Sequence, residues 1–421
     1  MRKMACIGLM VVLAAVWVGS VGAQEAPGLP LAVVTDSQVW VSGIGDSPKP
    51  ISFDAAYQNF SDLTWNPDGS ILAFTATDLN YTRSLWIANT PDLIPVQLVN
   101  DIAVAFPISF TADGRLLYAA STGEYDTQTE GPGAEKINVF AIMPVAGSTP
   151  ALIGTFSWGV GCGGGSSIPV HWRFWSETNS GPGGSKLALA LTPSGVVHST
   201  NCTGRGTALL DMNSGTDTVL GDNLGWVAVS PDGTQLAAIN NANPAELSGQ
   251  LVIVDLMTQA VTPITTSKVP TIVTWDNQGH LFYSAIEMTG NIPTTPEDQQ
   301  TFGEVVGYGG PATIEFNTAL IYQLDIASQT DTLVYSGPAY AVGRMIPTQD
   351  GSGLVFSLIP NMDRFIQGLV EGTIDYFGDH GTEQSMAAVS VSLYHLNLAD
   401  GSLSLIGEDL NQAALNTALM N

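Results

Sequence analysis

The stretch that decides the fold is Leu63-Thr-Trp-Asn-Pro-Asp-Gly-Ser-Ile-Leu-Ala-Phe74, which reads as a β-strand, a tight turn and a second β-strand. The residues on both sides of the turn are apolar and β-prone. Within the turn, Pro67 presets its own φ, Asp68 hydrogen-bonds nearby backbone, and Gly69 accepts a positive φ. The same unit recurs along the chain, so we interpret it as a building block of a repeat fold rather than as a site.

Five further copies align on the turn glycine, over residues 108–118, 189–197, 227–236, 273–283 and 346–356. The glycines at positions 69, 114, 195, 233, 279 and 351 lie 45, 81, 38, 46 and 72 residues apart. The short spacings are typical of a four-stranded propeller blade of about 40–45 residues, and the long spacings indicate a blade with an insertion. A large apolar residue precedes each glycine by four positions, except in the last copy, which has Pro347 there.

Each copy is followed by two more short apolar stretches separated by polar turn residues. The third strands are expected at residues 85–88, 137–141, 208–211, 251–255, 320–325 and 393–397. The fourth strands are expected at residues 95–98, 151–153, 218–220, 261–264, 332–335 and 403–406. Strand and turn at this spacing predict an all-β chain, a single β-propeller of four-stranded antiparallel blades over residues 31–421.

The clearest copy carries a resemblance to a known repeat family. The segment Val227-Ala-Val-Ser-Pro-Asp-Gly-Thr-Gln-Leu-Ala-Ala-Ile239, followed by Leu251-Val-Ile-Val-Asp255, resembles the TolB-type, WD40-like propeller repeat. The resemblance covers roughly residues 60–408 and implies the propeller fold. TolB-type propellers include a periplasmic protein that works with envelope proteins, but this chain has no room for that protein's extra N-terminal α/β domain, so its role is not carried over.

The blade count depends on the two ends of the propeller. Residues 31–53 hold three short strands without a turn motif, which resemble the second, third and fourth strands of a blade. We expect the missing first strand to come from residues 411–420, which would close the ring and remove an open edge. Six internal blades plus this shared blade give seven. The alternative is six blades with residues 410–419 as a helix.

Residues 1–23 are interpreted as a secretory signal peptide, with residues 24–30 as a short linker. Arg2 and Lys3 precede an apolar run from Met4 to Val18, and Val21-Gly-Ala23 provides a small-residue cleavage site. An uncleaved anchor is the alternative. The rest of the chain has no apolar run near the ~20 residues that a membrane span needs. We therefore expect a secreted or periplasmic protein with no membrane span after cleavage.

The charge balance limits the partners. The chain has 12 basic and 38 acidic residues, so loss of Arg2 and Lys3 leaves 10 against 38, a net charge of −28. This charge repels phosphate backbones, and we expect no nucleic-acid binding. It would attract cationic partners or divalent ions, although solubility alone is an alternative reason for it.

Four stretches are too long for turns, at residues 121–136, 155–186, 286–318 and 358–388. Loops between strands two and three of a blade leave from the same face as the loops between blades. We therefore expect all four insertions on one face, here called the insertion face, with the opposite turn face smooth. Long loops on a rigid scaffold commonly carry binding function.

Two of the insertions hold the candidate ligand-binding residues. The first, residues 158–175, is glycine-rich and then aromatic, and the second, residues 361–383, mixes aromatic, basic and acidic residues. The candidates are Trp158, His171, Trp172, Arg173, Trp175, Arg364, Phe365, Tyr376 and His380. They predict a platform on which a sugar or a peptide would stack, and packing of the aromatic residues against the blades is the alternative.

The second insertion also contains oxygen ligands of the kind that Ca²⁺ prefers. The candidate metal ligands are Asp363, Asp375, Asp379 and Glu383. Their spacing matches no known cation-binding loop. A solvated acidic loop with a short helix over residues 364–369 is therefore the alternative to a Ca²⁺ site, and no other cofactor is expected.

Two cysteines remain after signal cleavage, Cys162 and Cys202, and both fall in loops of the insertion face. In an oxidising compartment, an even pair placed in this way predicts a disulfide bond.

The sequence holds no Gly-x-Ser-x-Gly nucleophile elbow and no His-Glu-x-x-His zinc motif. His198, His280 and His395 lie on predicted strands and are interpreted as packed blade residues. We therefore expect an exported, non-catalytic scaffold that recognises an extracytoplasmic protein or glycan through the insertion face. The alternative is a metal-assisted hydrolase or lyase with its site on the same face, built around His171 and His380.

Overall fold

The three-dimensional structure is a computed structural model that describes most of the predicted propeller. The described residues are 31–35, 38–42, 48–53, 57–80, 82–102, 108–111, 113–126, 134–158, 189–191, 195–200, 206–211, 214, 216–221, 224–240, 249–297, 299–300, 313–348, 350–361, 363–371, 373–374, 390–408 and 412–415. No helix within these ranges is long and apolar enough to cross a membrane. The predicted signal peptide and linker, residues 1–30, lie outside them.

The strands in the described part of the chain form seven four-stranded antiparallel sheets, six of them from consecutive strands. Blade one holds β4 (Tyr57–Trp65), β5 (Ile71–Asp78), β6 (Arg83–Asn89) and β7 (Ile94–Val99). Blade two holds β8 (Ser109–Phe110), β9 (Leu116–Asp126), β10 (Ala134–Ile142) and β11 (Ala151–Trp158). Blade three holds β12 (Leu189–Leu191), β13 (Gly195–Thr200), β14 (Gly206–Asp211) and β15 (Asp217–Gly221).

The remaining consecutive blades follow the same order. Blade four holds β16 (Leu224–Val229), β17 (Gln235–Asn240), β18 (Gln250–Asp255) and β19 (Val261–Pro263). Blade five holds β20 (Pro270–Trp275), β21 (Leu281–Pro293), β22 (Thr313–Asp325) and β23 (Thr330–Pro338). Blade six holds β24 (Ala341–Pro347), β25 (Gly353–Ile359), β26 (Ser392–Asn397) and β27 (Leu403–Gly407). The four-stranded antiparallel blade predicted from the repeats is thus confirmed.

The seventh sheet joins strands from opposite ends of the propeller. In this shared blade, β28 (Gln412–Leu415) pairs with β1 (Leu31–Thr35), and β2 (Gln38–Ser42) and β3 (Lys49–Pro50) complete the sheet. Leu31 lies opposite Leu415, and Val34 lies opposite Gln412. The predicted strand from the tail is therefore present. Residues 412–415 are extended rather than helical, because the edge of β1 offers them a ladder of backbone hydrogen bonds.

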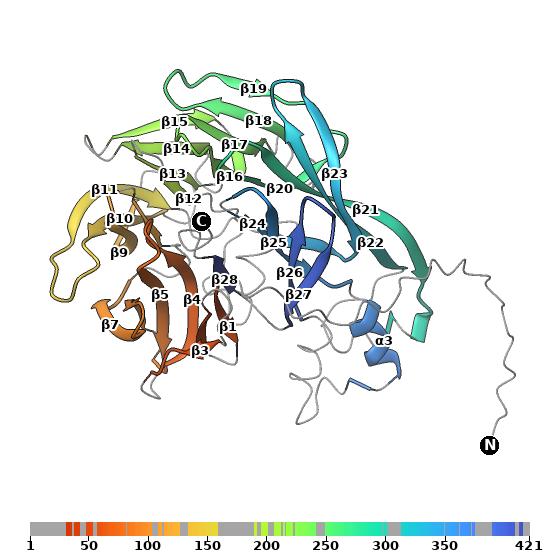
Figure 1. Ribbon diagram of the computed structural model, residues 1–421, viewed down its shortest axis with the longest axis horizontal. Coiled ribbons are helices and arrows are strands. Elements are labelled where there is room, and N and C mark those ends of the chain that lie inside the picture. The colour runs from red at the N-terminus through yellow and green to blue at the C-terminus, as the bar shows by residue number, and fades with distance from the viewer. Residues whose placement is uncertain are drawn as a thin grey trace, which may run out of the picture.

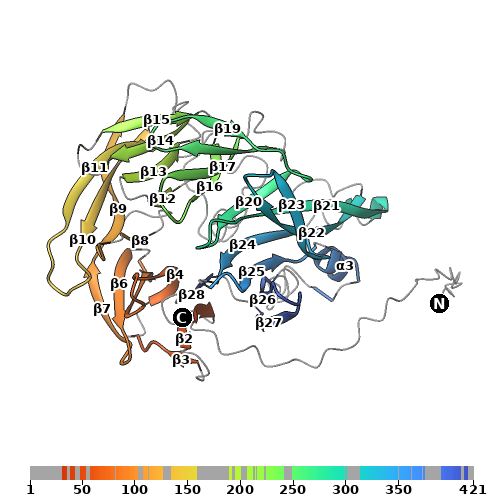
Figure 2. The same ribbon diagram turned by 45° about the horizontal axis from the view of Figure 1, so that its top comes forward.

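The sheets stand around a central axis, with the first strand of each blade innermost and the fourth outermost (Figures 1 and 2). The core lies between the sheets, where apolar side chains of neighbouring blades pack together. Examples are Val41 with Phe74, Ile239 with Tyr283, Phe282 with Phe356, and Leu31 with Val355. Full burial of such a side chain contributes about 1.5–3 kcal/mol, so these interfaces hold the ring together.

The middle strands are covered on both faces, which explains their nearly continuous apolar sequence. All seven residues of β25 are buried, and so are the four central residues of β17 and of β18. An outer strand such as β23 instead contains mostly exposed and half-buried residues. The alternating pattern of a one-sided sheet is therefore absent from the interior of these blades.

The repeated turn is braced by its own side chains. In blade four, the Ser230 hydroxyl donates to Asp232 Oδ1 at 2.6 Å and accepts from the Gln235 N–H at 2.9 Å. The Thr234 N–H also donates to Asp232 Oδ1, at 3.1 Å. Gly233 has a φ of 71°, in the left-handed region that favours glycine. The structural role predicted for the turn aspartates is confirmed by this network.

Blade one also contains a buried ion pair, between Arg83 and Asp62, whose side chains are only 4% and 9% exposed. The Asp62 carboxylate accepts further hydrogen bonds from Ser61 Oγ and Thr75 Oγ1, each at 2.8 Å. Asp62 has a φ of 56° within an irregularity of the β4–β5 register, and this local distortion accompanies the buried placement of its carboxylate.

We predict that Arg83→Met lowers the free energy of unfolding by about 3–5 kcal/mol, because it leaves the Asp62 carboxylate buried without its countercharge. Urea unfolding followed by circular dichroism measures the loss. The matched control is Lys268→Met, which breaks the exposed pair with Glu287, whose two side chains are 38% and 50% exposed. Exposed pairs contribute little, so the control should unfold nearly as the wild type does. Equal losses in the two variants would contradict the prediction.

We also predict an acid-sensitive contribution from the turn aspartates. Hydrogen bonds from Ser70, Ser230 and Thr348 hold the pKa values of Asp68, Asp232 and Asp350, respectively, below their usual range. A carboxyl group with a depressed folded-state pKa stabilises the fold above its unfolded pKa of about 3.9, and this contribution is lost as the pH falls through the lower folded value.

The urea midpoint should therefore fall as the pH is lowered below about 4. Replacing these three aspartates with asparagine should make that fall shallower, because the group that titrates is gone while an acceptor oxygen remains. A parallel fall in the wild type and the triple variant between pH 5 and pH 2 would count against this assignment.

Candidate functional site

The two ends of the blade-five insertion pair with each other and lengthen the hairpin of β21 and β22. Strands β21 and β22 each span 13 residues, and their pairing runs out to Pro293 opposite Thr313. Residues 286–293 and 313–318, expected to belong to a loop, are therefore strand. The extension beyond the blade is a β-ribbon that keeps its backbone groups paired.

Helix α3 (Asp363–Glu371), from the insertion of blade six, packs against this ribbon. Its Phe365, Ile366 and Leu369 form a buried cluster with Ile374, and Ile314 of β22 lies against that cluster. Figures 1 and 2 both show α3 beside the outer part of β22. The short helix predicted over residues 364–369 is present and is slightly longer.

Asn361 fixes the two insertions to each other through backbone hydrogen bonds. Its Oδ1 accepts from the Asn317 N–H at 3.0 Å, and its Nδ2 donates to the Asn317 carbonyl at 3.1 Å. We call the unit made by residues 286–293, 313–318, 361, 363–371, 373 and 374 the insertion platform. Two insertions from neighbouring blades thus meet on one side of the ring, as the loop geometry predicted for them.

The predicted ligand-binding residues are only partly covered by the structure. Phe365 is 7% exposed and packs in the α3 cluster. Asp363 and Arg364 lie in the first turn of α3, and Trp158 ends β11 opposite Glu135. The other candidates fall outside the described residues: His171, Trp172, Arg173, Trp175, Tyr376, His380, Asp375, Asp379 and Glu383.

The predicted disulfide and metal site remain predictions. Cys162 and Cys202 both lie outside the described residues. Among the residues that the structure does describe, no three or more His, Cys, Asp or Glu side chains come together in a way that would hold a metal ion.

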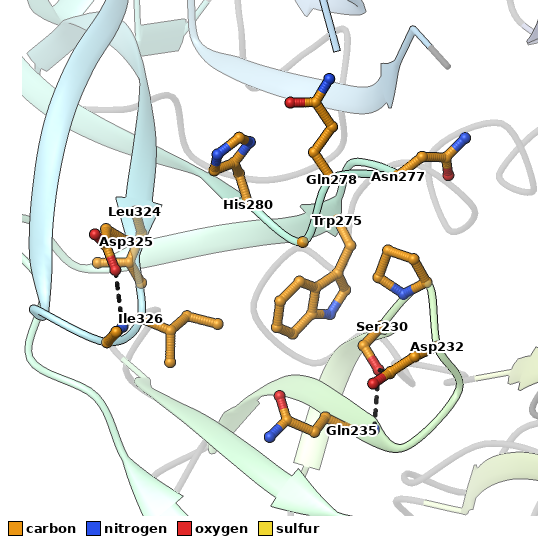
Figure 3. A pocket seen from close by; sticks show the side chains of 13 residues that line it. Ser230, Asp232, Gln235, Trp275, Asn277, Gln278, His280, Leu324, Asp325 and Ile326 are labelled. Carbon is orange, nitrogen blue, oxygen red and sulfur yellow. Dashed lines mark hydrogen bonds between the residues drawn. The ribbon is translucent and has the colours of Figure 1, made fainter. Parts of the chain in front are cut away.

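The opposite face carries a cleft of about 700 Å³ between blades four and five, here called the turn-face cleft. Residues 230–232 and Gln235 line it from blade four, Trp275 and residues 277–280 from the first turn of blade five, and residues 324–327 from that blade's second turn (Figure 3). The turn face was expected to be smooth. Here it is hollowed between the turns of two adjacent blades, with the ring of Trp275 between them (Figure 3).

The first turn of blade five departs from the repeated pattern. Asp276 occupies the position of Ser230, and its side chain is 1% exposed. Its Oδ1 accepts from the Gln278 N–H at 2.9 Å and from the His280 N–H at 2.8 Å. Its Oδ2 lies 2.7 Å from Nδ1 of His280, whose side chain is 45% exposed. Because a carboxylate only accepts, Nδ1 carries the proton in this contact.

Hydrogen bonds to neighbouring blades fix two further side chains of the cleft, those of Trp275 and Gln278. The Trp275 indole N–H donates to the Ala228 carbonyl of blade four at 3.0 Å, and its ring projects into the cleft between Ser230 and Ile326 (Figure 3). Gln278 Nε2 donates to the Asp350 carbonyl of blade six at 2.8 Å. The cleft is therefore built on contacts among three blades.

His280 is the residue that the sequence interpretation missed, because it was assigned to blade packing. The structure corrects this, since the side chain is half-exposed and paired with a buried carboxylate. The signal in the sequence was Asp276-Asn-Gln-Gly-His280 in place of the Ser-Pro-Asp-Gly turn of blade four, which exchanges the serine of the turn for an aspartate and adds an imidazole.

Comparison with known proteins identifies the fold alone. No family model matches the sequence, and the search of curated proteins found no match. The β-propeller domain of the Trilobed protease from Pyrococcus furiosus, which has an open velcro topology, is similar with a TM-score of 0.51 and 10% identity, over 90% of this chain and 94% of that one. The acylaminoacyl peptidase of Pyrococcus horikoshii gives a TM-score of 0.50 and 12% identity, over 88% and 47%.

TolB from Acinetobacter baumannii is also among the similar structures, with a TM-score of 0.42 and 12% identity over 75% of this chain. This chain spans 65% of the TolB chain and 47% of the peptidase chain. The propeller fold that the repeats imply is shared with the two structures from Pyrococcus, and no activity is transferred at 10–12% identity.

We predict that Asn361→Ala loosens the insertion platform, because it leaves the buried Asn317 N–H without its acceptor. Amide hydrogen exchange in residues 363–371 should become about tenfold faster, while exchange in β25 stays unchanged. Asn277→Ala, at an exposed turn position, is the matched control and should leave exchange in α3 as it is. Unchanged protection of α3 in Asn361→Ala would show that these hydrogen bonds do not hold the helix.

Proposed function

We propose that this chain is an exported, non-catalytic binding scaffold that recognises an extracytoplasmic protein or glycan through its insertion face. The observation that carries this proposal is the insertion platform, in which a ribbon from blade five and α3 from blade six are locked together by Asn361. A preorganised surface of this kind binds a partner with a smaller entropic cost than separate loops would.

The composition and the rest of the insertion face support the same reading. The aromatic segment at residues 158–175 is predicted to lie on this face, and its first residue, Trp158, ends β11. The net charge of −28 after signal cleavage favours neutral or cationic partners over anionic ones. Export is supported by the charged start, apolar run and small-residue cleavage site of residues 1–23.

The test uses the tagged, exported protein and an extract of the extracytoplasmic proteins and glycans of the producing cells. One variant replaces residues 159–188 with a Gly/Ser linker of equal length, and a second replaces residues 375–389 in the same way. We expect at least one of them to lose capture of the partner that the wild type retains. The matched control, Met257→Ser, changes a 90%-exposed side chain on the turn face and should retain capture.

Two results would count against the scaffold proposal. Equal capture by the wild type and both linker variants would remove the insertion face as the binding surface. A stoichiometric metal in the exported protein, together with metal-dependent hydrolysis or elimination that the linker variants lose, would instead support the hydrolase or lyase alternative.

A further inference from the structure

We propose that the turn-face cleft is a second binding site, for a neutral polyhydroxylated ligand of the saccharide class, and that Nε2 of His280 accepts a hydrogen bond from a ligand hydroxyl. This site is on the opposite face from the insertion platform and is independent of the proposed function.

The size and lining of the cleft suit a small sugar. Its volume of about 700 Å³ lies within the range of ligand sites, about 300–1,000 Å³. The ring of Trp275 offers an apolar face, and the amides of Gln235 and Asn277 offer both donors and acceptors for hydroxyl groups. Among the described residues that line the cleft there is no Lys or Arg, so a phosphate or carboxylate ligand would meet Asp232 and Asp325 without a countercharge from them.

The pairing with Asp276 determines what His280 presents to the cleft. With the Nδ1 proton directed at Asp276, the neutral form of the imidazole has its acceptor lone pair on Nε2. Within the described part of the chain, no hydrogen bond reaches that nitrogen. An acceptor of this kind takes a hydrogen bond from a donor on the ligand, and a sugar hydroxyl group supplies one.

The imidazole is not needed to hold the turn. Asp276 Oδ1 already accepts the two backbone N–H groups of the turn, and the residue after the glycine is Arg115 in blade two and Thr234 in blade four. His280 therefore adds a group that the repeat does not require. The Asp276 carboxylate, whose side chain is 1% exposed, fixes the orientation of the imidazole through Nδ1. Binding sites commonly preorganise a ligand-contacting side chain through such a buried partner.

The two carboxylates of the cleft favour a hydroxyl ligand over a cationic amine, because the turns already use them. Asp232 Oδ1 accepts from Ser230 Oγ and the Thr234 N–H, and its Oδ2 accepts from Thr234 Oγ1 at 2.9 Å. Asp325 Oδ1 accepts from the N–H groups of residues 327 and 328. Much of the acceptor capacity that an ammonium group would need is therefore occupied.

The test measures binding of the full-length exported protein to immobilised oligosaccharides. The neutral probes are hexasaccharides of β-1,4-glucose, α-1,4-glucose, β-1,4-xylose, β-1,4-mannose and β-1,4-N-acetylglucosamine, with oligogalacturonate as the anionic probe and spermine as the cationic probe. We expect binding to at least one neutral probe, and little binding to oligogalacturonate.

Asp276→Asn is the sharpest variant, because it keeps the acceptor oxygen for the turn while its amide N–H donates to Nδ1. The proton then moves to Nε2, which becomes a donor, and affinity for the neutral probe should fall about tenfold. His280→Ala should cause a similar loss. Arg115→Ala, at the same turn position in blade two, is the matched control and should bind as the wild type does, with thermal melts confirming that all variants fold.

The proposal is overturned if no neutral saccharide binds, if spermine alone binds, or if Asp276→Asn and His280→Ala bind as the wild type does. The linker variant of residues 159–188 separates this site from the insertion face. Retained saccharide binding in that variant supports the cleft. Loss of saccharide binding there, with full binding in the two cleft variants, would assign the sugar to the insertion face and leave only the scaffold proposal standing.

Discussion

The structure depends on burial of each sheet between its two neighbours. The middle strands are covered on both faces. All seven residues of β25 are buried, and the centres of β17 and β18 are buried as well. A single blade would leave both apolar faces in water, so the blades are stable only as a set. The turn hydrogen bonds, the ion pair of Arg83 and the contacts of Trp275 add local interactions to this packing of sheet on sheet.

The same constraint divides the molecule into a repetitive face and a variable face. Turns between strands one and two are short and carry their own hydrogen bonds, as Ser230 and Asp232 illustrate. The connections on the other face differ in length from blade to blade. Two of the long ones contain regular secondary structure, in the extensions of β21 and β22 and in α3. The turn-face cleft arises where one repetitive turn was changed by substitution rather than by insertion.

The turns could be predicted from the sequence, because they depend on adjacent residues. Strand pairing between distant residues could be predicted only in part. The repeated turns, of which Ser230-Pro-Asp-Gly233 is the clearest, located the blades because each turn is determined by four adjacent residues. The tail strand β28 was predictable because an unpaired edge of β1 demands a partner. The ribbon of β21 and β22 was missed because its register is set by residues 20 (Pro293 and Thr313) to 31 (Glu287 and Thr318) positions apart, and no turn motif marks it. The half-exposed position of His280 and its pairing with Asp276 could not be predicted, because they depend on the burial of the Asp276 side chain in the folded turn.

Pairing of β28 with β1 has a consequence for how the protein is made. The residues joined, Leu31 and Leu415, are 415 − 31 = 384 positions apart, and bringing the ends of a flexible segment that long together costs about 5 kcal/mol of chain entropy. Because synthesis delivers β1–β3 first, these strands wait with an open edge until the last strand arrives. Chains that lack β28 are therefore the forms most exposed to intermolecular strand exchange, which makes this strand a safeguard against aggregation.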